Sequence, residues 1–294
     1  RGHGLIFRDA SIFDQADWLL NTPSGVIDLR SGQVLDHDPA RLITKIAGAA
    51  YVPGAESPAL KSALDAVPAD ALGWLQLRLG EALSGRSGEQ LTLLSGGGRN
   101  GKTLLMGSVF RAMGDYAAKV PNTLLLRSRQ VGAATPERMT LRGIRLAYME
   151  ETPEDGYLDA TVVKDLLDAE EIEGRYLYKD TVTWRPTHSL FLNTNPAPTM
   201  GDTGDGAWRR LTRLDFPFRY RKADEELEHD TDRRGDPGLK LALGGSREGR
   251  EALLAWLVAG AVRFFGKGSL EGEQEPDSVR AAVIDCNDRT RAMF

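Results

Sequence analysis

The spacing of apolar residues separates an N-terminal α+β part of the chain from a longer part in which strands alternate with helices. Residues 25–38 alternate apolar and polar positions around an Arg-Ser-Gly turn, which predicts a β-hairpin. Residues 69–85 place leucines at helical spacing, and Gly85 is the predicted helix stop. We therefore expect a small α+β and helical domain over residues 1–88.

The pattern changes at Leu91, where a short apolar run predicts a strand leading into a glycine-rich loop. A helical pattern follows the loop and continues to Gly114. Further buried strands are predicted at residues 144–150 and 187–195. Buried strands separated by helices indicate a parallel α/β sheet, so we assign residues 89–222 to one α/β domain with helices on both sides of the sheet.

Residues 223–294 are predicted to form a helical C-terminal segment. Within it, residues 250–266 are apolar over most of the helical circumference, so this helix is expected to pack into a core. Residues 229–249 are polar and rich in Gly, Arg and Asp, which favours a surface loop. The longest apolar run, residues 253–262, is too short to span a bilayer.

Composition narrows the class of protein. The chain has 294 residues, of which 41% are hydrophobic, and a net charge of −5, which argues against a surface that coats nucleic acid throughout. The only cysteine, Cys286, allows no intrachain disulfide, and the four histidines lack metal-ligand spacing. No signal peptide is recognisable, so a reducing, cytosolic compartment is expected. Because the chain does not begin with Met, we interpret it as a fragment of a longer protein.

One motif points directly to a ligand. The pattern Gly96-x-x-x-x-Gly101-Lys102-Thr103 lies between a predicted strand and a predicted helix, which is the context that a phosphate-binding loop requires. Backbone N–H groups of such a loop surround phosphates, and the helix N-terminus adds partial positive charge. Lys102 is expected to reach the β- and γ-phosphates of ATP, and Thr103 to ligate Mg²⁺. The predicted nucleotide-binding residues are Gly96, Gly97, Gly98, Arg99, Asn100, Gly101, Lys102, Thr103 and Leu104.

Polar residues end the next two predicted strands. Glu150 and Glu151 follow an apolar run, and we assign Glu150 to Mg²⁺ and Glu151 to the polarisation of an attacking water. Surface glutamates after a core strand are the alternative. Asn195 is predicted to orient the lytic water through its amide, although Asn-Pro also favours a simple turn.

Basic residues gather in two places beyond the loop. Residues 209–222 carry six basic residues and one acid, and their arginines could supply a finger to a neighbouring subunit's γ-phosphate. Residues 171–187 alternate around Lys179-Asp180 and predict a hairpin whose basic and aromatic residues suit contact with a single nucleic-acid strand. A solvated basic loop and an ordinary sheet-edge hairpin are the respective alternatives.

The compact order of these motifs resembles that of the superfamily 3 helicases of viruses and mobile elements, a branch of the AAA+ ATPases. The sequence GGGRNGKT at residues 96–103 is similar to the loop of phage and plasmid primase–helicases of the P4 and D5 type. Residues 24–39 resemble the segment that precedes the ATPase in those proteins, and residues 253–268 resemble their C-terminal helix. The resemblance runs from about residue 18 to the end of the chain.

This resemblance implies an ATP-dependent DNA helicase that acts in replication of a phage, plasmid or other mobile element. The family works as a ring, usually a hexamer, that translocates 3′ to 5′ on single-stranded DNA with ATP and Mg²⁺ between subunits. The resemblance also implies a priming domain ahead of this segment in the full-length protein, and a location in the cytoplasm of a bacterial host.

Roles follow from the resemblance residue by residue. Lys102 and Thr103 match the nucleotide and Mg²⁺ residues, Glu150 and Glu151 the acidic pair, and Asn195 the strand-tip sensor. Arg210 matches the arginine finger, with Arg209 and Arg213 as less favoured occupants. The residues that match the DNA-contacting part of the family's pore hairpin are Arg175, Tyr176 and, three positions on, Lys179.

Other classes of function stay open at this point. A ring that binds ATP and DNA as a replication initiator or loader, without unwinding, would carry the same motifs. A monomeric phosphotransferase would use the same loop, although arginines placed for action in trans argue against it. The chain lacks an Asn-Lys-x-Asp guanine-reading motif, which argues against a GTPase. RNA is an alternative track, because no motif reads a 2′-hydroxyl.

Overall fold

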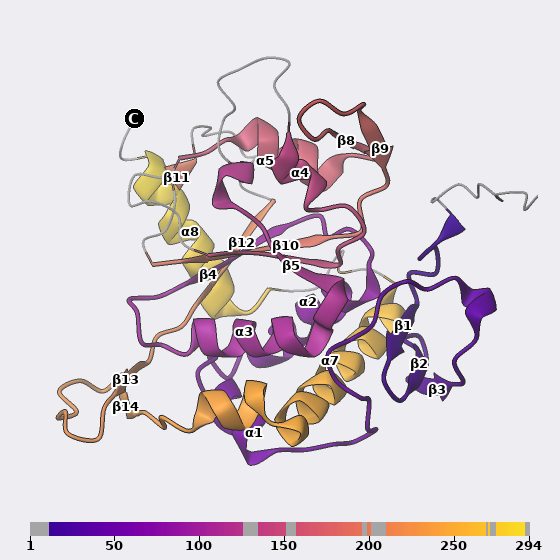
Figure 1. Ribbon diagram of the computed structural model, residues 1–294. Coiled ribbons are helices and arrows are strands. Elements are labelled where there is room, and N and C mark those ends of the chain that lie inside the picture. Colours follow the sequence, from indigo (N-terminus) through magenta and orange to yellow (C-terminus); the bar gives the residue numbers. More distant parts are fainter. Residues whose placement is uncertain are drawn as a thin grey trace, which may run out of the picture.

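A five-stranded parallel sheet forms the centre of the computed structural model (Figure 1). The structure describes residues 12–125, 135–150, 157–195, 199–200, 210–268, 270 and 275–291. The sheet has the order β12-β4-β10-β6-β5. Its strands are β4 (Leu91–Ser95), β5 (Ala117–Lys119), β6 (Leu146–Glu150), β10 (Ser189–Thr194) and β12 (Leu211–Asp215). The predicted α/β fold class, with helices flanking a parallel sheet, is confirmed.

The order of the strands places β4 at a switch point of the chain. Both of its neighbours, β10 and β12, come later in the sequence, whereas the next strand along the chain, β5, lies at the far edge. Because all five strands are parallel, their carboxyl ends share one edge of the sheet. Loops at the carboxyl edge beside a switch point form the crevice in which α/β proteins bind ligands.

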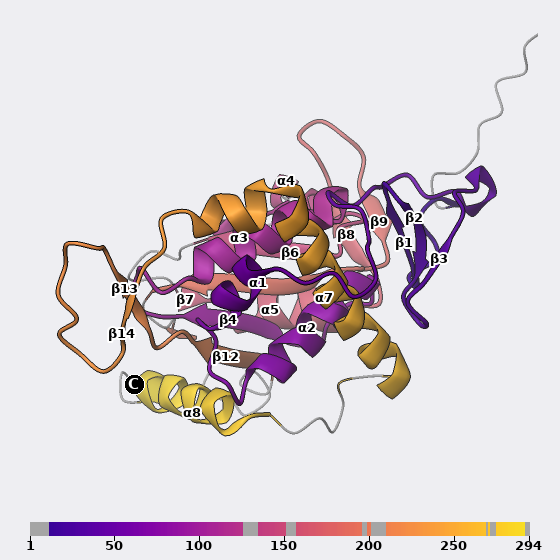
Figure 2. The same cartoon turned by 90° about the horizontal axis from the view of Figure 1, so that it is seen from below.

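Helices α2 (Leu72–Ser84), α3 (Lys102–Met113) and α7 (Arg247–Lys267) cover one face of the sheet (Figures 1 and 2). The predicted helices over 69–85, 102–114 and 250–266 are therefore confirmed, although α7 begins earlier than its apolar pattern. Helices α2 and α7 approach so closely that a Cβ atom on Gly80 would lie 2.2 Å from the carbonyl carbon of Gly260.

The opposite face is covered by η4 (Asn122–Leu125), α4 (Pro136–Met139) and α5 (Ala160–Asp168) (Figure 1). Strand β10 shows how both faces are filled. Phe191 belongs to the core beneath α3 and α7, whereas Leu190 and Leu192 belong to the core beneath α5. Side chains of a strand alternate between faces, so a strand that is covered on both sides has a continuous apolar sequence.

An antiparallel sheet of β1 (Leu19–Thr22), β2 (Gly25–Asp28) and β3 (Gln33–Leu35) precedes the helices and confirms the predicted hairpin. Buried Arg145 ties this sheet to the rest of the chain, because its guanidinium donates to the carbonyl oxygens of Leu19 and Leu83, each at 2.8 Å. Buried residues of β1 and β2 share one hydrophobic core with α2 and α7. The three predicted domains thus contribute to a common core, and their boundaries at 88 and 222 stay predictions.

The prediction of a surface loop over residues 229–249 is wrong in part. Strands β13 (Arg219–Arg221) and β14 (Asp232–Arg234) pair and form a projecting segment, residues 219–234, which we call the arm (Figure 1). A π-helical turn, η5 (Leu241–Gly245), then leads into α7. Arg221 holds the base of the arm through ion pairs with Asp232 at 3.0 Å and Glu228 at 2.8 Å. Charge pairs rather than apolar periodicity stabilise the arm, so the hydrophobic pattern did not predict it.

The other elements complete the cover of the sheet. The C-terminal helix α8 (Asp277–Arg291) packs along β12. None of the helices within the described ranges is long and apolar enough to cross a membrane. The remaining elements are η2 (Pro39–Arg41), α1 (Pro58–Leu64), η3 (Gly114–Tyr116), β7 (Tyr157–Leu158), β8 (Ile172–Gly174), β9 (Val182–Trp184) and β11 (Thr199–Met200).

Candidate functional site

The glycine-rich loop connects β4 to the first turn of α3, which is the predicted context. Gly101, the residue before the helix, has φ +87°, a conformation that favours glycine. It also touches the N-terminal part of the chain, because a Cβ atom there would lie 2.9 Å from the Cβ of Ala66. The loop is therefore closely packed on the side that faces α1.

Lys102 links the loop to the tip of β10. Its Nζ donates to the carbonyl oxygen of Gly96 at 2.7 Å and to Oδ1 of Asn195 at 3.4 Å. The lysine is only 2% exposed, so its charge lies within the crevice rather than in solvent. Two residues that were predicted from separate motifs, Lys102 and Asn195, are thus brought together at the carboxyl edge.

A second amide, Asn193, also reaches the first turn of α3. Its Nδ2 donates to Oγ1 of Thr103 at 3.3 Å, and the residue is 6% exposed. Among the described residues, its Oδ1 has no hydrogen-bond partner. Asn193 was not predicted as a site residue. The period of two along a strand could have found it, since it lies two residues before Asn195, which directly follows β10.

Glu150 is the last residue of β6, which pairs with β10 on the side away from β4. The strand register sets Asn193 between Glu150 of β6 and Leu94 of β4. The Glu150 carboxylate forms an ion pair with Lys119 at the end of β5, with 2.8 Å between Nζ and Oε2. Four of the predicted residues, Lys102, Thr103, Glu150 and Asn195, therefore lie at one edge of the sheet. Glu151 lies outside the described residues.

Arg210 lies at the opposite, amino edge of the sheet. It directly precedes β12, and its carbonyl oxygen accepts a hydrogen bond from the backbone N–H of Leu91 at the start of β4. Its guanidinium pairs in a bidentate manner with Asp168 at the end of α5. Arg213 is buried and pairs with Asp215 at 2.8 Å. Arg209 lies outside the described residues. Arg210 is thus separated from the phosphate loop of its own chain by the length of a strand.

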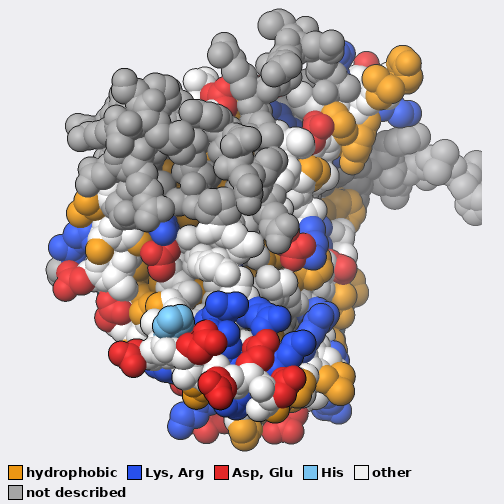
Figure 3. All heavy atoms as spheres, turned by 90° about the vertical axis from the view of Figure 1, so that its left-hand side faces the viewer, with side chains coloured by type: hydrophobic (Ala, Val, Ile, Leu, Met, Phe, Trp, Pro, Cys, Tyr) orange, Lys and Arg blue, Asp and Glu red, His pale blue; other side chains and the backbone are white. Residues whose placement is uncertain are grey.

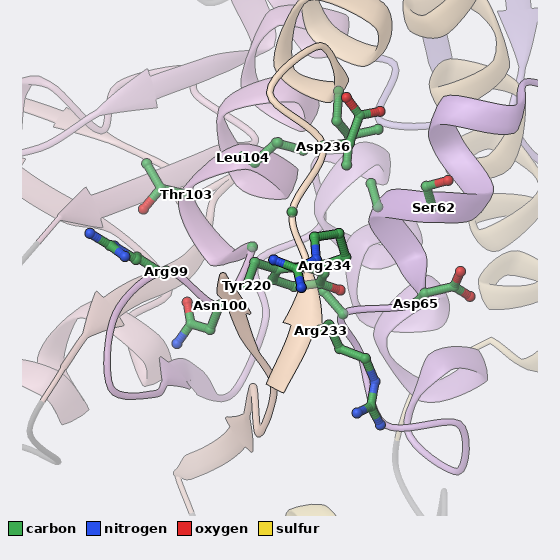
Figure 4. A pocket seen from close by; sticks show the side chains of 15 residues that line it. Ser62, Asp65, Arg99, Asn100, Thr103, Leu104, Tyr220, Arg233, Arg234 and Asp236 are labelled. Carbon is green, nitrogen blue, oxygen red and sulfur yellow. The ribbon is translucent and has the colours of Figure 1, made fainter. Parts of the chain in front are cut away.

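A pocket of about 700 Å³ opens beside the loop (Figure 4). One wall is the loop and the first turn of α3, including Thr103 and Leu104. A second wall comes from α1 and the residues after it, including Asp65, and the third from the arm, including Tyr220. Burial and the Asp65 carboxylate both raise the pKa of the Tyr220 hydroxyl. The pocket combines apolar surface with charged groups at its rim.

The arm is bonded to the loop as well as facing it. The backbone N–H of Tyr220 donates to the carbonyl oxygen of Arg99 at 2.8 Å, and the Arg99 guanidinium pairs with Glu225 at 2.8 Å. Figure 3 shows the side of the molecule from which the arm projects, where Lys and Arg side chains lie among Asp and Glu side chains. The basic residues of the arm are therefore largely balanced by neighbouring acids.

The predicted hairpin over 171–187 is present as antiparallel β8 and β9. Its base is fixed to the start of α4, since the backbone N–H of Thr135 donates to the carbonyl oxygen of Arg175 at 3.1 Å. At the tip, Tyr176, Tyr178 and Lys179 are exposed. In Figure 1 the hairpin and the arm project from opposite sides of the molecule. The hairpin is thus separate from the edge that holds the loop.

Comparison with known proteins connects this architecture to a family. The family described as "D5 N terminal like" matches residues 6–67, which include the antiparallel sheet and α1. A "Putative primase" of African swine fever virus is 30% identical over 221 residues, and the match covers 70% of this chain. The chain is therefore similar to proteins of the D5-type primase–helicase family.

A second viral relative and a solved structure agree with this similarity. A "Putative helicase" of Acanthamoeba polyphaga mimivirus is 27% identical over 220 residues, covering 72% of this chain. The chain spans 23% of the length of either viral protein. The apo C-terminal region of NrS-1 has the same fold, with a TM-score of 0.55 and 15% identity over 81% of this chain and 52% of that one. Because the primase and helicase relatives come from viruses of eukaryotes, the bacterial host stays a prediction.

Proposed function

We propose that this chain is the ATPase segment of a D5-type replication protein and that it drives DNA strand separation as a helicase. The observation that carries the proposal is the convergence of Lys102, Thr103, Glu150 and Asn195 at the carboxyl edge beside the switch point of the sheet. The name of one viral relative, a "Putative helicase", supports the same activity, and that of the other, a "Putative primase", supports a role in replication.

Each residue at this edge has a task in phosphoryl transfer. The loop amides and Lys102 would bind the β- and γ-phosphates of ATP, and Asn195 would orient the attacking water. Thr103 and Glu150 would hold Mg²⁺, because both offer oxygen ligands, which Mg²⁺ prefers. When bound, the cation would neutralise part of the negative charge on the phosphates. The Oδ1 of buried Asn193, which has no hydrogen-bond partner within the described part of the chain, is a further oxygen close to this position. Lys119 would release Glu150 when the metal binds.

The pocket beside the loop would take the nucleoside half of ATP. Its volume of about 700 Å³ falls in the range of small-molecule sites. The Tyr220 ring and the Leu104 side chain offer apolar surface for a base, and Asp65 offers an acceptor at the rim. The segment matched by the D5 family would then supply one wall of the nucleotide site.

The positions of the β8–β9 hairpin and of Arg210 are consistent with assembly of several copies of the chain into a ring. Arg210 is too far from its own loop to act there, and an arginine finger must reach a neighbouring subunit's nucleotide. Release from Asp168 would free its guanidinium for that role. The exposed tip of the hairpin, with Tyr176 and Lys179, would contact single-stranded DNA at the axis of a hexamer.

The test is unwinding of matched DNA forks that carry either a 3′ or a 5′ single-stranded tail, with ATP and Mg²⁺. Lys102→Ala is the negative control, and Lys240→Ala, which changes an exposed lysine outside the site, is the matched control. Unwinding that requires a 3′ tail and is lost only in Lys102→Ala is the expected result. ATP hydrolysis without opening of either fork would instead favour the initiator or loader. The absence of ATP binding would refute both.

A further inference from the structure

Asn193 is a buried polar side chain at the carboxyl edge whose hydrogen bonding the proposed function does not explain. Its amide lies inside the crevice with the nitrogen bonded to Thr103 at 3.3 Å and the oxygen without a described partner. A buried polar atom without a partner is disfavoured, and such an atom in a folded protein requires an explanation. The three residues before it on the strand, Leu190, Phe191 and Leu192, are apolar and buried.

When Thr103 binds a cation, its hydroxyl proton needs an acceptor, and the present bond with Asn193 does not supply one. A threonine hydroxyl ligates a metal through an oxygen lone pair, and its proton must then point away from the metal to an acceptor. In the present arrangement the Asn193 N–H instead donates to that same oxygen. An asparagine amide holds both a donor and an acceptor, and its terminal torsion is broad and nearly two-fold. A half turn of the amide would present Oδ1 to the hydroxyl proton.

We propose that Asn193 is a positioning residue for the metal site: its Oδ1 accepts the Thr103 hydroxyl proton and so directs the Thr103 oxygen toward Mg²⁺. This proposal rests on the proposed function, because it requires a Mg²⁺–nucleotide at the loop. The register supports it, since Asn193 stands on β10 between the strand that leads to the loop and the strand that ends in Glu150. Partners that orient metal ligands in this way are worth about 10- to 100-fold in metal affinity.

The test compares the affinity for a fluorescent ATP analogue in Mg²⁺ with the affinity in EDTA, so it does not depend on hydrolysis. Asn193→Leu keeps the approximate side-chain size and removes both the acceptor and the donor. We expect it to lose about tenfold of the Mg²⁺-dependent gain in affinity, while its Kd in EDTA stays at the wild-type value. Asn193→Asp keeps an acceptor at the same position and should retain the Mg²⁺-dependent gain.

Asn122→Leu is the matched control, because it makes the same change in η4, outside the residues to which a role in binding is assigned. This variant should keep the wild-type ratio of affinities in Mg²⁺ and EDTA. A second check is Thr103→Val, which removes the hydroxyl. Adding Asn193→Leu to Thr103→Val should have no further effect on that ratio.

Three results would overturn the proposal. In the first, Asn193→Leu keeps the full Mg²⁺ dependence while its thermal unfolding matches the wild type. In the second, Asn193→Asp loses as much as Asn193→Leu, which would show that the donor matters rather than the acceptor. In the third, wild-type protein binds the nucleotide in neither buffer, in which case the proposed function itself fails. The wild-type measurement thus separates failure of the site from failure of the Asn193 role.

Discussion

The carboxyl edge of the sheet and the tip of the β8–β9 hairpin use their side chains in opposite ways. At the edge, the charged group of Lys102 and the amide of Asn193 are buried, with 2% and 6% of these residues exposed. At the tip, large apolar groups are exposed: Tyr178 is 94% exposed and Leu177 is 64% exposed. Buried polar groups and exposed apolar groups are the two departures from ordinary burial that carry information about function.

The two departures have different costs. A buried polar group reduces stability unless it is paired, so the edge must be held by the surrounding fold. An exposed tyrosine contributes little to folding, so the tip is free to vary without a loss of stability. Substitutions at the edge should therefore change stability and ligand binding together, whereas substitutions at the tip should change binding alone.

Gly101→Ala should have the largest effect on the edge. A Cβ atom at this position would lie 2.9 Å from the Cβ of Ala66, and φ is +87°. We expect a loss of about 3 kcal/mol in the free energy of unfolding, from backbone strain and overpacking together. The ATP affinity should fall as well, because the loop would be displaced. Urea unfolding and a nucleotide titration measure the two effects.

Substitutions at two other loop glycines separate the contribution of backbone strain from that of overpacking. Gly98 has φ +86° and open space where a Cβ atom would lie, so Gly98→Ala should cost only the strain, about 1–2 kcal/mol. Gly97 has neither positive φ nor a near neighbour, and Gly97→Ala should change stability by less than about 0.5 kcal/mol. Equal stability of the three variants would contradict the packing argument.

His188 tests whether burial of a polar group at β10 is enough to indicate a ligand site. It directly precedes β10, at the strand's other end from Asn193, and burial lowers its pKa to about 4, while the backbone of Leu166 opposes the shift. The unfolded chain, with a histidine pKa near 6.5, binds more protons between these values. Stability should therefore fall as pH decreases from 6.5 to 4, by about 3 kcal/mol in total.

Urea unfolding between pH 7.5 and pH 4 measures this slope, and His188→Leu should flatten it. ATP affinity at pH 7.5 should be the same in His188→Leu and the wild type, because the residue lies at the amino edge. A weaker ATP affinity in His188→Leu would mean that a buried polar group at the amino end of β10 also affects the nucleotide site. Burial at the carboxyl edge would then not be specific to ligand binding.

Local patterns predicted the parts of this fold that are stabilised locally. Gly85 ends α2 in the left-handed conformation that glycine favours, and Gly114 follows α3 where the helical pattern stops. The phosphate loop was predictable because its spacing and its flanking elements are adjacent in sequence. The hairpin was predictable for the same reason.

Contacts between distant residues were not predictable from such patterns. Asn193 is recognisable as a site residue only through its contact with Thr103, which lies 90 positions earlier in the chain. The arginines of the basic stretch 209–222 were considered as sources of an arginine finger, yet Arg213 and Arg221 pair with acids in the folded chain. Charge counted along a sequence does not reveal which charges are already paired in the fold.

Tyr178→Ala tests the tip through stacking. Stacking of a base on an aromatic ring is worth about 1–3 kcal/mol, so single-strand affinity should fall by about tenfold or more. The free energy of unfolding should change by less than about 0.5 kcal/mol, because the ring is almost fully exposed to solvent. Tyr178→Phe should retain binding, and Leu241→Ala, at an exposed apolar residue outside the hairpin, should change neither quantity. Fluorescence anisotropy with a labelled oligonucleotide and urea unfolding provide the measurements.

Removal of the two positive charges between β8 and β9, Lys179 at the tip and Arg175 next to it in the connection, should have the smallest effect, which is on the salt dependence of binding. Arg175→Ala combined with Lys179→Ala should reduce the slope of log affinity against log salt by about 0.7 for each phosphate that the hairpin no longer neutralises. The matched control is Lys164→Ala combined with Arg185→Ala, which removes the same charge from exposed positions outside the tip. If both pairs reduce the slope equally, the attraction belongs to the whole surface. A reduction confined to the tip would mean that a chain with a net charge of −5 places its DNA-binding charge on one hairpin, where a ring would bring the copies together.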